Sequence, residues 1–465
     1  MTRLSVAELQ EILDADRMGD DAHVDRPALR LDHVRIDSRE VHAGDVFLAL
    51  RGQNQHGNEF AVDAFERGAA AVIVDKPGVV APEGRWVLQV EDTLQALRRA
   101  ADWQRSSFTG RVVAVTGSAG KTTTRQMIDT VLGSRFSGTA SPANYNNHLG
   151  VPLSMLHWQE NDAYAVLEMG ASARGEIAEL CALARPSIGV ITNIGNAHLG
   201  TFGGPAAVAS AKGELLEALP ADGLAILNGD DRQLRRIAER SRAVVEWFGR
   251  GADCDVMATD VRSAEGRLCF TVDGERFSVP VWGRHHLTSA LAAVAIGRAF
   301  GLSVAEISRA LSDFEPPPMR CQITNIGAAR VINDAYNSNP LAMRAALEVL
   351  REDPSMGQRI VVCGDMRDLG HDAPRLHRQT GNEVVTVCGA DMLVACGDHA
   401  NDMVAGAIAA GMPRERTVAC RYPEDAEPVL ARIVGPGDVV LVKGSRSMNM
   451  ERLLAGFPKS ARRAA

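Results

Sequence analysis

The stretch VVAVTGSAGKTT at residues 112–123 decides the fold of the middle of the chain. Residues 112–115 form a short apolar run, which is typical of a buried strand, and residues 123–131 are compatible with a helix. Gly117 and Gly120 lie in the turn between them. In a strand–turn–helix of this kind, backbone N–H groups and the helix N-terminus bind phosphate. We call residues 117–122 the phosphate loop.

The phosphate loop predicts a nucleotide site. Lys121 is expected to reach the outer phosphates, and Thr122 can hold Mg²⁺. Position 115 holds a valine where the longer form of this motif has its first glycine, so the loop has the short G-x-x-G-K-T form. The alternative is a glycine turn beside a surface lysine. The predicted phosphate-binding residues are Gly117, Ser118, Ala119, Gly120, Lys121, Thr122 and Thr123.

Short apolar runs alternate with helical segments on both sides of the phosphate loop. The expected buried strands are residues 164–167, 188–191, 224–227, 359–363, 392–396 and 439–442. This alternation predicts α/β domains with largely parallel sheets. In such sheets ligands bind at the carboxyl ends of the strands. The polar residues that follow each strand are therefore the candidates for function.

The length of 465 residues predicts about three domains. One joint is expected at residues 106–110, between a helical stretch at 93–104 and the strand at 112–115. The second is expected at residues 315–319, where three consecutive prolines exclude a helix. The predicted domains are residues 1–108, 109–316 and 317–465.

Composition excludes several classes of protein. A formal net charge of −8 argues against a nucleic-acid binder, which needs a basic face. The first eight residues lack the apolar segment of a secretory signal, and no apolar run approaches membrane-spanning length. The eight cysteines include no C-x-x-C pair and are expected to be reduced thiols. We therefore expect a cytoplasmic protein that does not insert into membranes.

Two further polar residues follow predicted strands. Glu168 comes directly after the strand at 164–167, and His198 lies in the loop after the strand at 188–191. One carboxylate and one imidazole do not by themselves specify Mg²⁺. Glu168 could instead cap a helix, and His198 could be an ordinary loop histidine. Together with the phosphate loop, both residues are candidates for the metal of a bound nucleotide.

Motifs along nearly the whole chain resemble the Mur ligase family of bacterial cell-wall synthesis. They are DSR at 37–39, GDVFLAL at 44–50, GSAGKT at 117–122, NYNNHLGVP at 144–152, LEMG at 167–170, TNIGNAH at 192–198, AKGE at 211–214, LNGDD at 227–231, INDAYNSNP at 332–340, GDMRDLG at 364–370 with His377, and VKGSRS at 442–447. The late motifs are similar to those of the family member that adds a dipeptide.

The resemblance implies an α/β protein of three domains: an N-terminal domain for a UDP-linked substrate, a central P-loop-type ATP-binding domain and a C-terminal Rossmann-like domain for the incoming dipeptide. The implied reaction joins D-alanyl-D-alanine to UDP-N-acetylmuramoyl-tripeptide through an acyl phosphate, with ATP and Mg²⁺. We expect a monomer, although the sequence does not fix the oligomeric state. Two alternatives stay open. One is the sibling ligase that adds the third amino acid, and the other is a nucleotide-dependent binding module without ligase activity.

Family roles carry over to matching positions only. The implied catalytic residues are Lys121, Glu168, His198 and Lys212, with Lys212 carbamylated. The implied metal ligands are Thr122, Glu168, His198 and the carbamate of Lys212. The nucleotide would also contact Asn228, Arg320 and Asp334, and the uridine diphosphate would contact Ser38 and Arg39. The candidates on the dipeptide side are Tyr336, Asn337, Asn339, Lys443, Ser445 and Arg446.

The stretch GRHHLTSAL at 283–291 departs from the family pattern. The family usually has asparagine after the first histidine and again three residues later. His286 and Ser289 stand at these two positions. The adenine contacts of the family are therefore not carried over to this chain, and stacking of the base on His286 is the hypothesis in their place.

Overall fold

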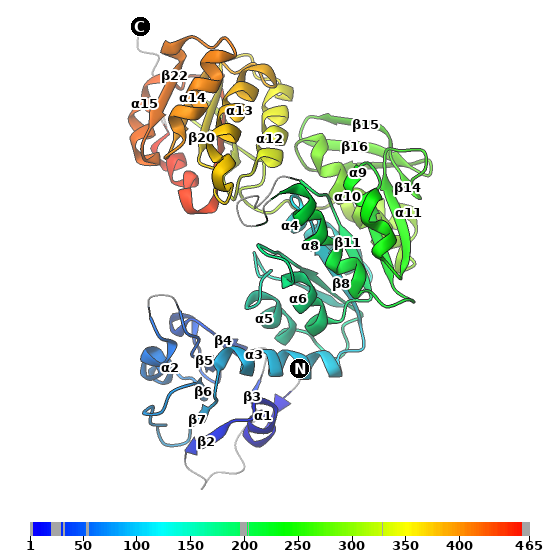
Figure 1. The fold of residues 1–465 in the computed structure, drawn as a ribbon, viewed down its shortest axis with the longest axis vertical. Helices are drawn as coiled ribbons and strands as arrows, with labels where there is room; N and C mark the ends of the chain where they lie inside the picture. Colours follow the sequence, from blue (N-terminus) through cyan, green and yellow to red (C-terminus); the bar gives the residue numbers. More distant parts are fainter. Residues whose placement is uncertain are drawn as a thin grey trace.

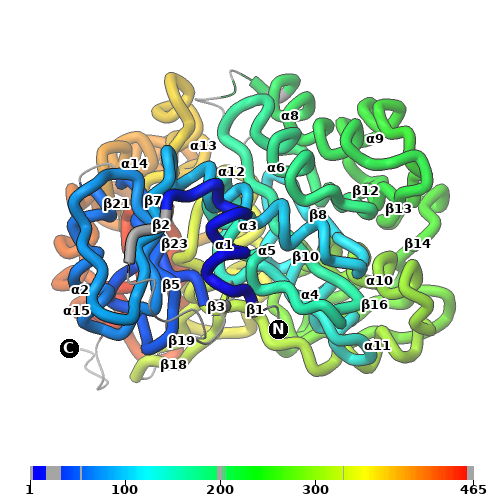
Figure 2. The backbone as a smooth tube through the Cα atoms, turned by 90° about the horizontal axis from the view of Figure 1, so that it is seen from below, coloured from blue at the N-terminus to red at the C-terminus, as the bar shows by residue number. Residues whose placement is uncertain are grey.

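The computed structural model describes residues 3–19, 29–30, 33–52, 55–195, 202, 204–327 and 329–457. Figure 1 shows three lobes along the longest axis, with the N-terminal lobe in blue at the bottom and the C-terminal lobe in yellow to red at the top. Seen from below, the N-terminal lobe lies in front of the C-terminal lobe (Figure 2). The domain boundaries at 108 and 316 stay predictions.

The N-terminal lobe contains a five-stranded sheet in the order β2-β7-β6-β5-β4, parallel except for the β2–β7 pair. Its elements are β1 (Arg3–Leu4), α1 (Val6–Leu13), β2 (Asp16–Gly19), β3 (Leu29–Arg30), β4 (Val34–Arg35), η2 (Ser38–Glu40), β5 (Val46–Leu48), η3 (Gly57–Phe60), α2 (Ala61–Glu66), β6 (Ala71–Val74), β7 (Trp86–Gln89) and α3 (Thr93–Ser107). Asp92 caps α3 by accepting from the Gln95 N–H. Because α3 continues through Ser107, the start of the predicted joint at 106–110 was wrong: those two residues are helical.

The central lobe is built on a seven-stranded parallel sheet in the order β14-β13-β12-β11-β8-β10-β9. Its elements are β8 (Arg111–Thr116), α4 (Lys121–Gly133), β9 (Gly138–Ala140), α5 (Gly150–Leu156), β10 (Tyr164–Glu168), α6 (Glu176–Ala184), β11 (Ile188–Ile191), α8 (Pro205–Ala218), β12 (Leu224–Asn228), α9 (Arg232–Ile237), η4 (Ala238–Arg240), β13 (Val244–Gly249) and β14 (Val256–Met257). The strands predicted at 164–167, 188–191 and 224–227 are confirmed as β10, β11 and β12.

A second, antiparallel sheet follows in the same lobe, in the order β15-β16-β17. Its strand β16 alternates buried and half-buried side chains, as expected for a sheet with one covered face. The elements of this segment are β15 (Thr259–Ala264), β16 (Arg267–Val272), β17 (Glu275–Val279), η5 (Arg284–His286), α10 (Leu287–Ala299) and α11 (Val304–Ser312). Nearly all of α10 is buried, and the helix packs against α4.

The C-terminal lobe contains a six-stranded sheet in the order β18-β19-β23-β20-β21-β22, parallel except for the β18–β19 pair. Its elements are β18 (Gln322–Ile326), β19 (Ala329–Asp334), α12 (Pro340–Glu352), β20 (Arg359–Gly364), η6 (Gly370–Asp372), α13 (Ala373–Thr386), β21 (Met392–Cys396), α14 (Ala400–Ala409), η7 (Arg414–Arg416), β22 (Thr417–Cys420), η8 (Pro423–Ala426), α15 (Glu427–Ile433), β23 (Val439–Lys443), η9 (Arg446–Met448) and η10 (Met450–Gly456). The strands predicted at 359–363, 392–396 and 439–442 are confirmed. The prolines at 316–318 lie in a segment without helix or strand, as expected.

The strand register of the central sheet brings several chain segments to one edge. Glu168, the last residue of β10, pairs with Val115 of β8, and Ile191 of β11 pairs with Thr116. The carboxyl ends of β8, β10, β11 and β12 are therefore adjacent, and the phosphate loop begins at that edge. The α/β class with largely parallel sheets is confirmed. Of the helices in the described part of the chain, none has the length and apolar character needed to cross a bilayer.

Candidate active site

A cavity of about 590 Å³ lies at this edge of the central sheet and is lined by residues of both the central and the C-terminal lobes. Most of the predicted site residues line it. They are Gly117, Ser118, Ala119, Gly120, Lys121, Thr122, Thr123, Glu168, Lys212, Asn228, Arg320, Asp334, Tyr336, Asn337, Asn339, Lys443 and Arg446. Residues more than 300 positions apart in the sequence, such as Lys121 and Lys443, thus share one cavity, which is a property of the tertiary structure alone.

The phosphate loop is held in shape by the segment after β11. The side chain of Asn193 makes two bonds to Ala119: its Oδ1 accepts from the backbone N–H at 2.9 Å, and its Nδ2 donates to the carbonyl at 3.0 Å. Gly120 caps α4 with a φ of +81°, and a Cβ at Gly117 would collide with the hydroxyl of Thr192. Contacts within the protein therefore fix the shape of the loop, and the N-terminus of α4 lies at the cavity.

Lys121 lies at the first position of α4. Its Nζ donates to the carbonyl of Gly117 at 2.9 Å, so the ammonium is folded back over the loop. Burial lowers the pKa of Lys121, the carboxylate of Glu168 opposes this shift, and the guanidinium of Arg320 adds to it. Arg320 also donates to the hydroxyl of Thr122 at 3.4 Å. Two cations thus flank the place where phosphates would bind.

Glu168 has one satisfied and one unsatisfied carboxylate oxygen. Its Oε1 accepts from Nδ2 of Asn146 at 2.8 Å, whereas its Oε2 is buried and has no hydrogen-bond partner among the described residues. Only 2% of Glu168 is exposed. An unpartnered carboxylate oxygen in a buried position is costly unless a cation or a donor binds it. Because Mg²⁺ prefers oxygen ligands, Glu168 and the nearby hydroxyl of Thr122 fit this ion.

Lys212 projects from α8 into the same cavity and is 3% exposed. Burial, and secondarily the charge of Lys121, lowers the pKa of Lys212 to about 7. The position of α8 is fixed by Glu214, whose carboxylate accepts from the backbone N–H groups of Gly175 at 2.8 Å and Ala178 at 3.1 Å. Glu214 thereby caps the N-terminus of α6 and holds the two helices together.

The C-terminal lobe contributes an ion pair and a stacked cation. Nζ of Lys443 lies 2.5 Å from Oδ2 of Asp334 and donates to the carbonyl of Asn337 at 2.9 Å. The guanidinium carbon of Arg320 lies 4.2 Å from the centre of the Tyr336 ring. Asn339 donates to the carbonyl of Ser118 at 3.3 Å, so the C-terminal lobe directly contacts the phosphate loop.

Some predicted residues lie elsewhere. Ser38 and Arg39 are in the N-terminal lobe and do not line the cavity; Ser38 is buried, and the exposed Arg39 pairs with Asp37 at 2.6 Å. Hydrogen bonds from Arg39 lower the pKa of Asp37 to about 2. Ser445 is buried and does not line the cavity, and its Oγ accepts from the Arg367 N–H at 2.8 Å. His198 lies outside the described residues.

Asn146 and Asn193 stand in the motifs quoted above, but their sequence context alone gives neither residue a role. The structure gives each one a partner that the sequence does not indicate: Glu168 for Asn146 and Ala119 for Asn193. At the departure from the family pattern, Ser289 accepts from the hydroxyl of Thr124 at 2.9 Å. The buried His286 packs against His285, and burial lowers its pKa well below the ordinary value.

Three family models match the chain. Residues 30–105 match "Mur ligase family, catalytic domain", residues 115–297 match "Mur ligase middle domain", and residues 319–446 match "Mur ligase, glutamate ligase domain". Two relatives described as UDP-N-acetylmuramoyl-tripeptide--D-alanyl-D-alanine ligase come from Bacillus subtilis and Escherichia coli. The first is 34% identical and covers 92% of this chain and 93% of its own; the second is 32% identical and covers 99% of both.

Solved structures resemble the whole chain. MurF from Acinetobacter baumannii has a TM-score of 0.85 at 29% identity and covers 98% of each chain. A MurF ligase from Thermotoga maritima in complex with ADP has a TM-score of 0.78 at 29% identity and covers 92% of this chain and 97% of that chain. The motifs, the three mainly parallel sheets, the preformed phosphate loop and these similarities agree. The chain belongs to the Mur ligase family.

Proposed function

We propose that this chain is an ATP-dependent ligase that joins D-alanyl-D-alanine to UDP-N-acetylmuramoyl-tripeptide, giving UDP-N-acetylmuramoyl-pentapeptide, ADP and phosphate in peptidoglycan synthesis. The observation that carries this function is the shared cavity, where a preformed phosphate loop faces Asp334, Lys443 and Arg446 of a second lobe. The relatives described as the dipeptide-adding ligase favour this reaction over that of the sibling ligase. We further propose a monomer that works in the cytoplasm.

The reaction takes two steps. The terminal carboxylate of the tripeptide attacks the γ-phosphorus of ATP, so that a carboxyl–phosphate bond forms and the bond to ADP breaks. The amine of the dipeptide then attacks the acyl carbon, loses a proton and expels phosphate. Backbone N–H groups of the phosphate loop and the ammonium of Lys121 stabilise the negative charge on the transferring group. Closure of the lobes around the bound substrates would exclude water, which would otherwise hydrolyse the acyl phosphate.

Mg²⁺ fits the oxygen atoms present at the edge of the central sheet. We propose Thr122, Glu168, His198 and the carbamate of Lys212 as its ligands. When bound, the ion supplies charge neutralisation at the phosphates. For the nucleotide we propose contacts to Asn228, Arg320 and Asp334. For the dipeptide side we propose Tyr336, Asn337, Asn339, Lys443 and Arg446, and Ser445 supports this segment through its bond with the N–H of Arg367.

The function is tested with purified protein, ATP, Mg²⁺, D-alanyl-D-alanine and a UDP-tripeptide that ends in either diaminopimelate or lysine. We expect a product heavier than the UDP-tripeptide by one dehydrated dipeptide, together with one ADP for each product. ADP formation should require both acceptor and dipeptide. Product formed from a UDP-dipeptide and a single amino acid would instead assign the sibling reaction. ADP release without either peptide substrate would assign a nucleotide-dependent module.

Arg39 is proposed to bind the diphosphate of the UDP-linked substrate, because a guanidinium can form paired bonds to phosphate oxygens. In the structure Arg39 is exposed and its partner is an acidic side chain, Asp37, which an incoming anion can replace. We expect Arg39→Ala to raise KM for the UDP-tripeptide and to leave KM for ATP and for the dipeptide unchanged. Arg99→Ala, which removes another exposed arginine of the same lobe that also pairs with an aspartate, is the matched control. An equal rise in all three KM values contradicts the assignment.

Asn146 is proposed to orient Glu168 for the metal, because it is the hydrogen-bond donor to Oε1. Loss of a residue that positions a metal ligand typically weakens metal affinity about 10- to 100-fold. We therefore expect Asn146→Ala to shift the Mg²⁺ concentration for half-maximal rate upward by about that factor. Asn382→Ala, on the exposed side of α13, serves as the control. An unchanged Mg²⁺ dependence in Asn146→Ala would remove this role.

A further inference from the structure

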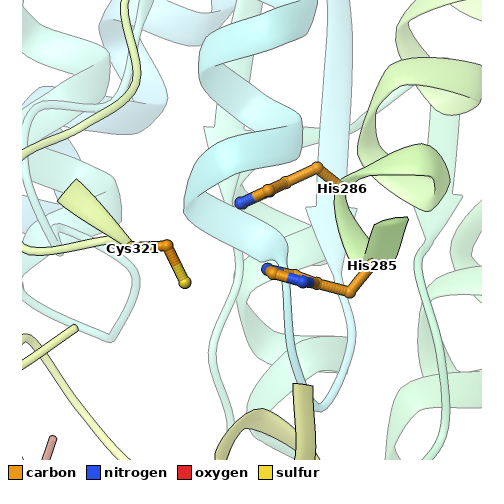
Figure 3. Close-up of side chains that lie close together, drawn as sticks. All are labelled: His285, His286 and Cys321. Atoms are coloured by element: carbon orange, nitrogen blue, oxygen red, sulfur yellow. The ribbon is translucent and has the colours of Figure 1, made fainter. Parts of the chain in front are cut away.

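Two imidazoles and a thiol converge at one side of the nucleotide cavity. His285 and His286 come from η5 in the central lobe, and Cys321 comes from the linker directly before β18. One ligand atom from each residue lies within 4.8 Å of the others. Figure 3 shows the three side chains directed toward one another. The cluster thus joins two lobes through side chains that are all able to ligate a metal.

The chemistry of this cluster differs from that of the proposed Mg²⁺ site. Imidazole nitrogen and thiolate sulfur are the ligands that Zn²⁺ prefers, whereas Mg²⁺ requires oxygen. Tetrahedral bonds of about 2.0 Å to nitrogen and 2.3 Å to sulfur place neighbouring ligand atoms about 3.3 to 3.5 Å apart. Small side-chain rotations would therefore close the observed spacing around one ion, with no rearrangement of the backbone.

The backbone around the cluster is already fixed. The N–H of Cys321 donates to Oδ1 of Asp334 at 3.1 Å, and Cys321 itself has a φ of +48°, which is uncommon for a residue with a side chain. His286 and Cys321 are buried, whereas His285 is exposed. A metal would therefore be held by two buried ligands and reached from the side of His285. An open fourth position on that side can hold water.

We propose that His285, His286 and Cys321 form a binding site for a single thiophilic divalent cation of the zinc type. Binding replaces the proton of the Cys321 thiol with the metal and leaves the two imidazoles neutral. Because the ligands belong to η5 and to the interdomain linker, the bound ion ties the central lobe to the C-terminal lobe. None of the three residues is a proposed ligand of Mg²⁺, so the site is separate from the Mg²⁺ site. All three line the nucleotide cavity, so the site is adjacent to the nucleotide.

Co²⁺ is the probe for this proposal, because a cobalt–thiolate bond gives a charge-transfer absorption in the near ultraviolet. We expect the intact protein to bind one equivalent of Co²⁺ with that absorption, and one equivalent of Zn²⁺ to abolish it. Cys321→Ser should remove the thiolate absorption. His286→Asn should weaken Co²⁺ binding at least about tenfold, since one of three protein ligands is lost.

Cys254→Ser and Cys269→Ser are the matched controls, because these two cysteines are only half-buried and lie outside the cluster. Both should keep the absorption of the unsubstituted protein. Thermal unfolding of each variant shows whether it is folded. If Cys321→Ser does not fold, the Co²⁺ affinity of His286→Asn decides the test. The proposal is wrong if the protein gives no thiolate absorption, if His286→Asn binds Co²⁺ as tightly as the parent, or if a control variant loses the signal instead.

Discussion

Lys121→Ala is expected to lower kcat by about a hundredfold or more, because it removes a preorganised cation from the transferring phosphate. The ammonium of Lys121 lies over the phosphate loop, where it donates to the carbonyl of Gly117, so the cation is held next to the place where phosphates would bind. Neither Arg320 nor the N-terminus of α4 can replace Lys121, because both groups already stabilise the negative charge of the phosphate in the parent protein. Steady-state kinetics with saturating substrates measures the effect.

The same substitution should leave the fold intact. The loop keeps its shape through the bonds between Asn193 and Ala119, which Lys121→Ala does not touch. The expected midpoint of thermal unfolding is therefore close to that of the parent protein. Lys76→Ala, an exposed lysine of the N-terminal lobe, should be normal in both kcat and stability. Turnover near the parent value in folded Lys121→Ala would overturn the assignment of the phosphate loop.

Lys212→Ala is expected to be inactive, because we propose that Lys212 works as a carbamate. Burial lowers the pKa of this lysine to about 7, so a large fraction of the amine is neutral at neutral pH and can react with CO₂. The product is an anion with two oxygens, which suits both Mg²⁺ and the neighbouring Lys121. Acetate should partly rescue Lys212→Ala by supplying a carboxylate. Lys212→Arg should stay inactive because a guanidinium remains protonated and forms no carbamate.

The pKa of Lys212 also sets the direction of the pH dependence. Below pH 7 the amine becomes protonated and no longer reacts with CO₂, so activity should fall as the pH is lowered through that value. Depletion of CO₂ should lower activity further, and added bicarbonate should restore it. Carbon-13 NMR with labelled bicarbonate should show one carbamate signal in the parent and in Lys76→Ala, and none in Lys212→Ala. Full activity of Lys212→Ala or Lys212→Arg without added acetate would remove Lys212 from the mechanism.

The sequence alone determined the features that depend on neighbouring residues. The strand–loop–helix at 112–131 was predictable because each part has its own local preference: apolar β-branched residues, glycines with positive φ, and a helix after the turn. The strands β10, β11, β12, β20, β21 and β23 were predictable because strands buried on both faces are continuous apolar runs. The prolines at 316–318 likewise predicted a segment without helix, since proline excludes a helix.

Only the tertiary structure decided how distant segments meet. The antiparallel sheet β15–β17 was not predicted from the sequence, because its strands are only partly buried and mix polar with apolar residues instead of forming long apolar runs. Three features of the site depend on residues from different parts of the chain. They are the pairing of Asn146 with Glu168, the burial that lowers the pKa of Lys212, and the stacking of Arg320 on Tyr336. Such contacts are set by strand register and by the packing of the lobes, and the local sequence pattern predicts neither of these.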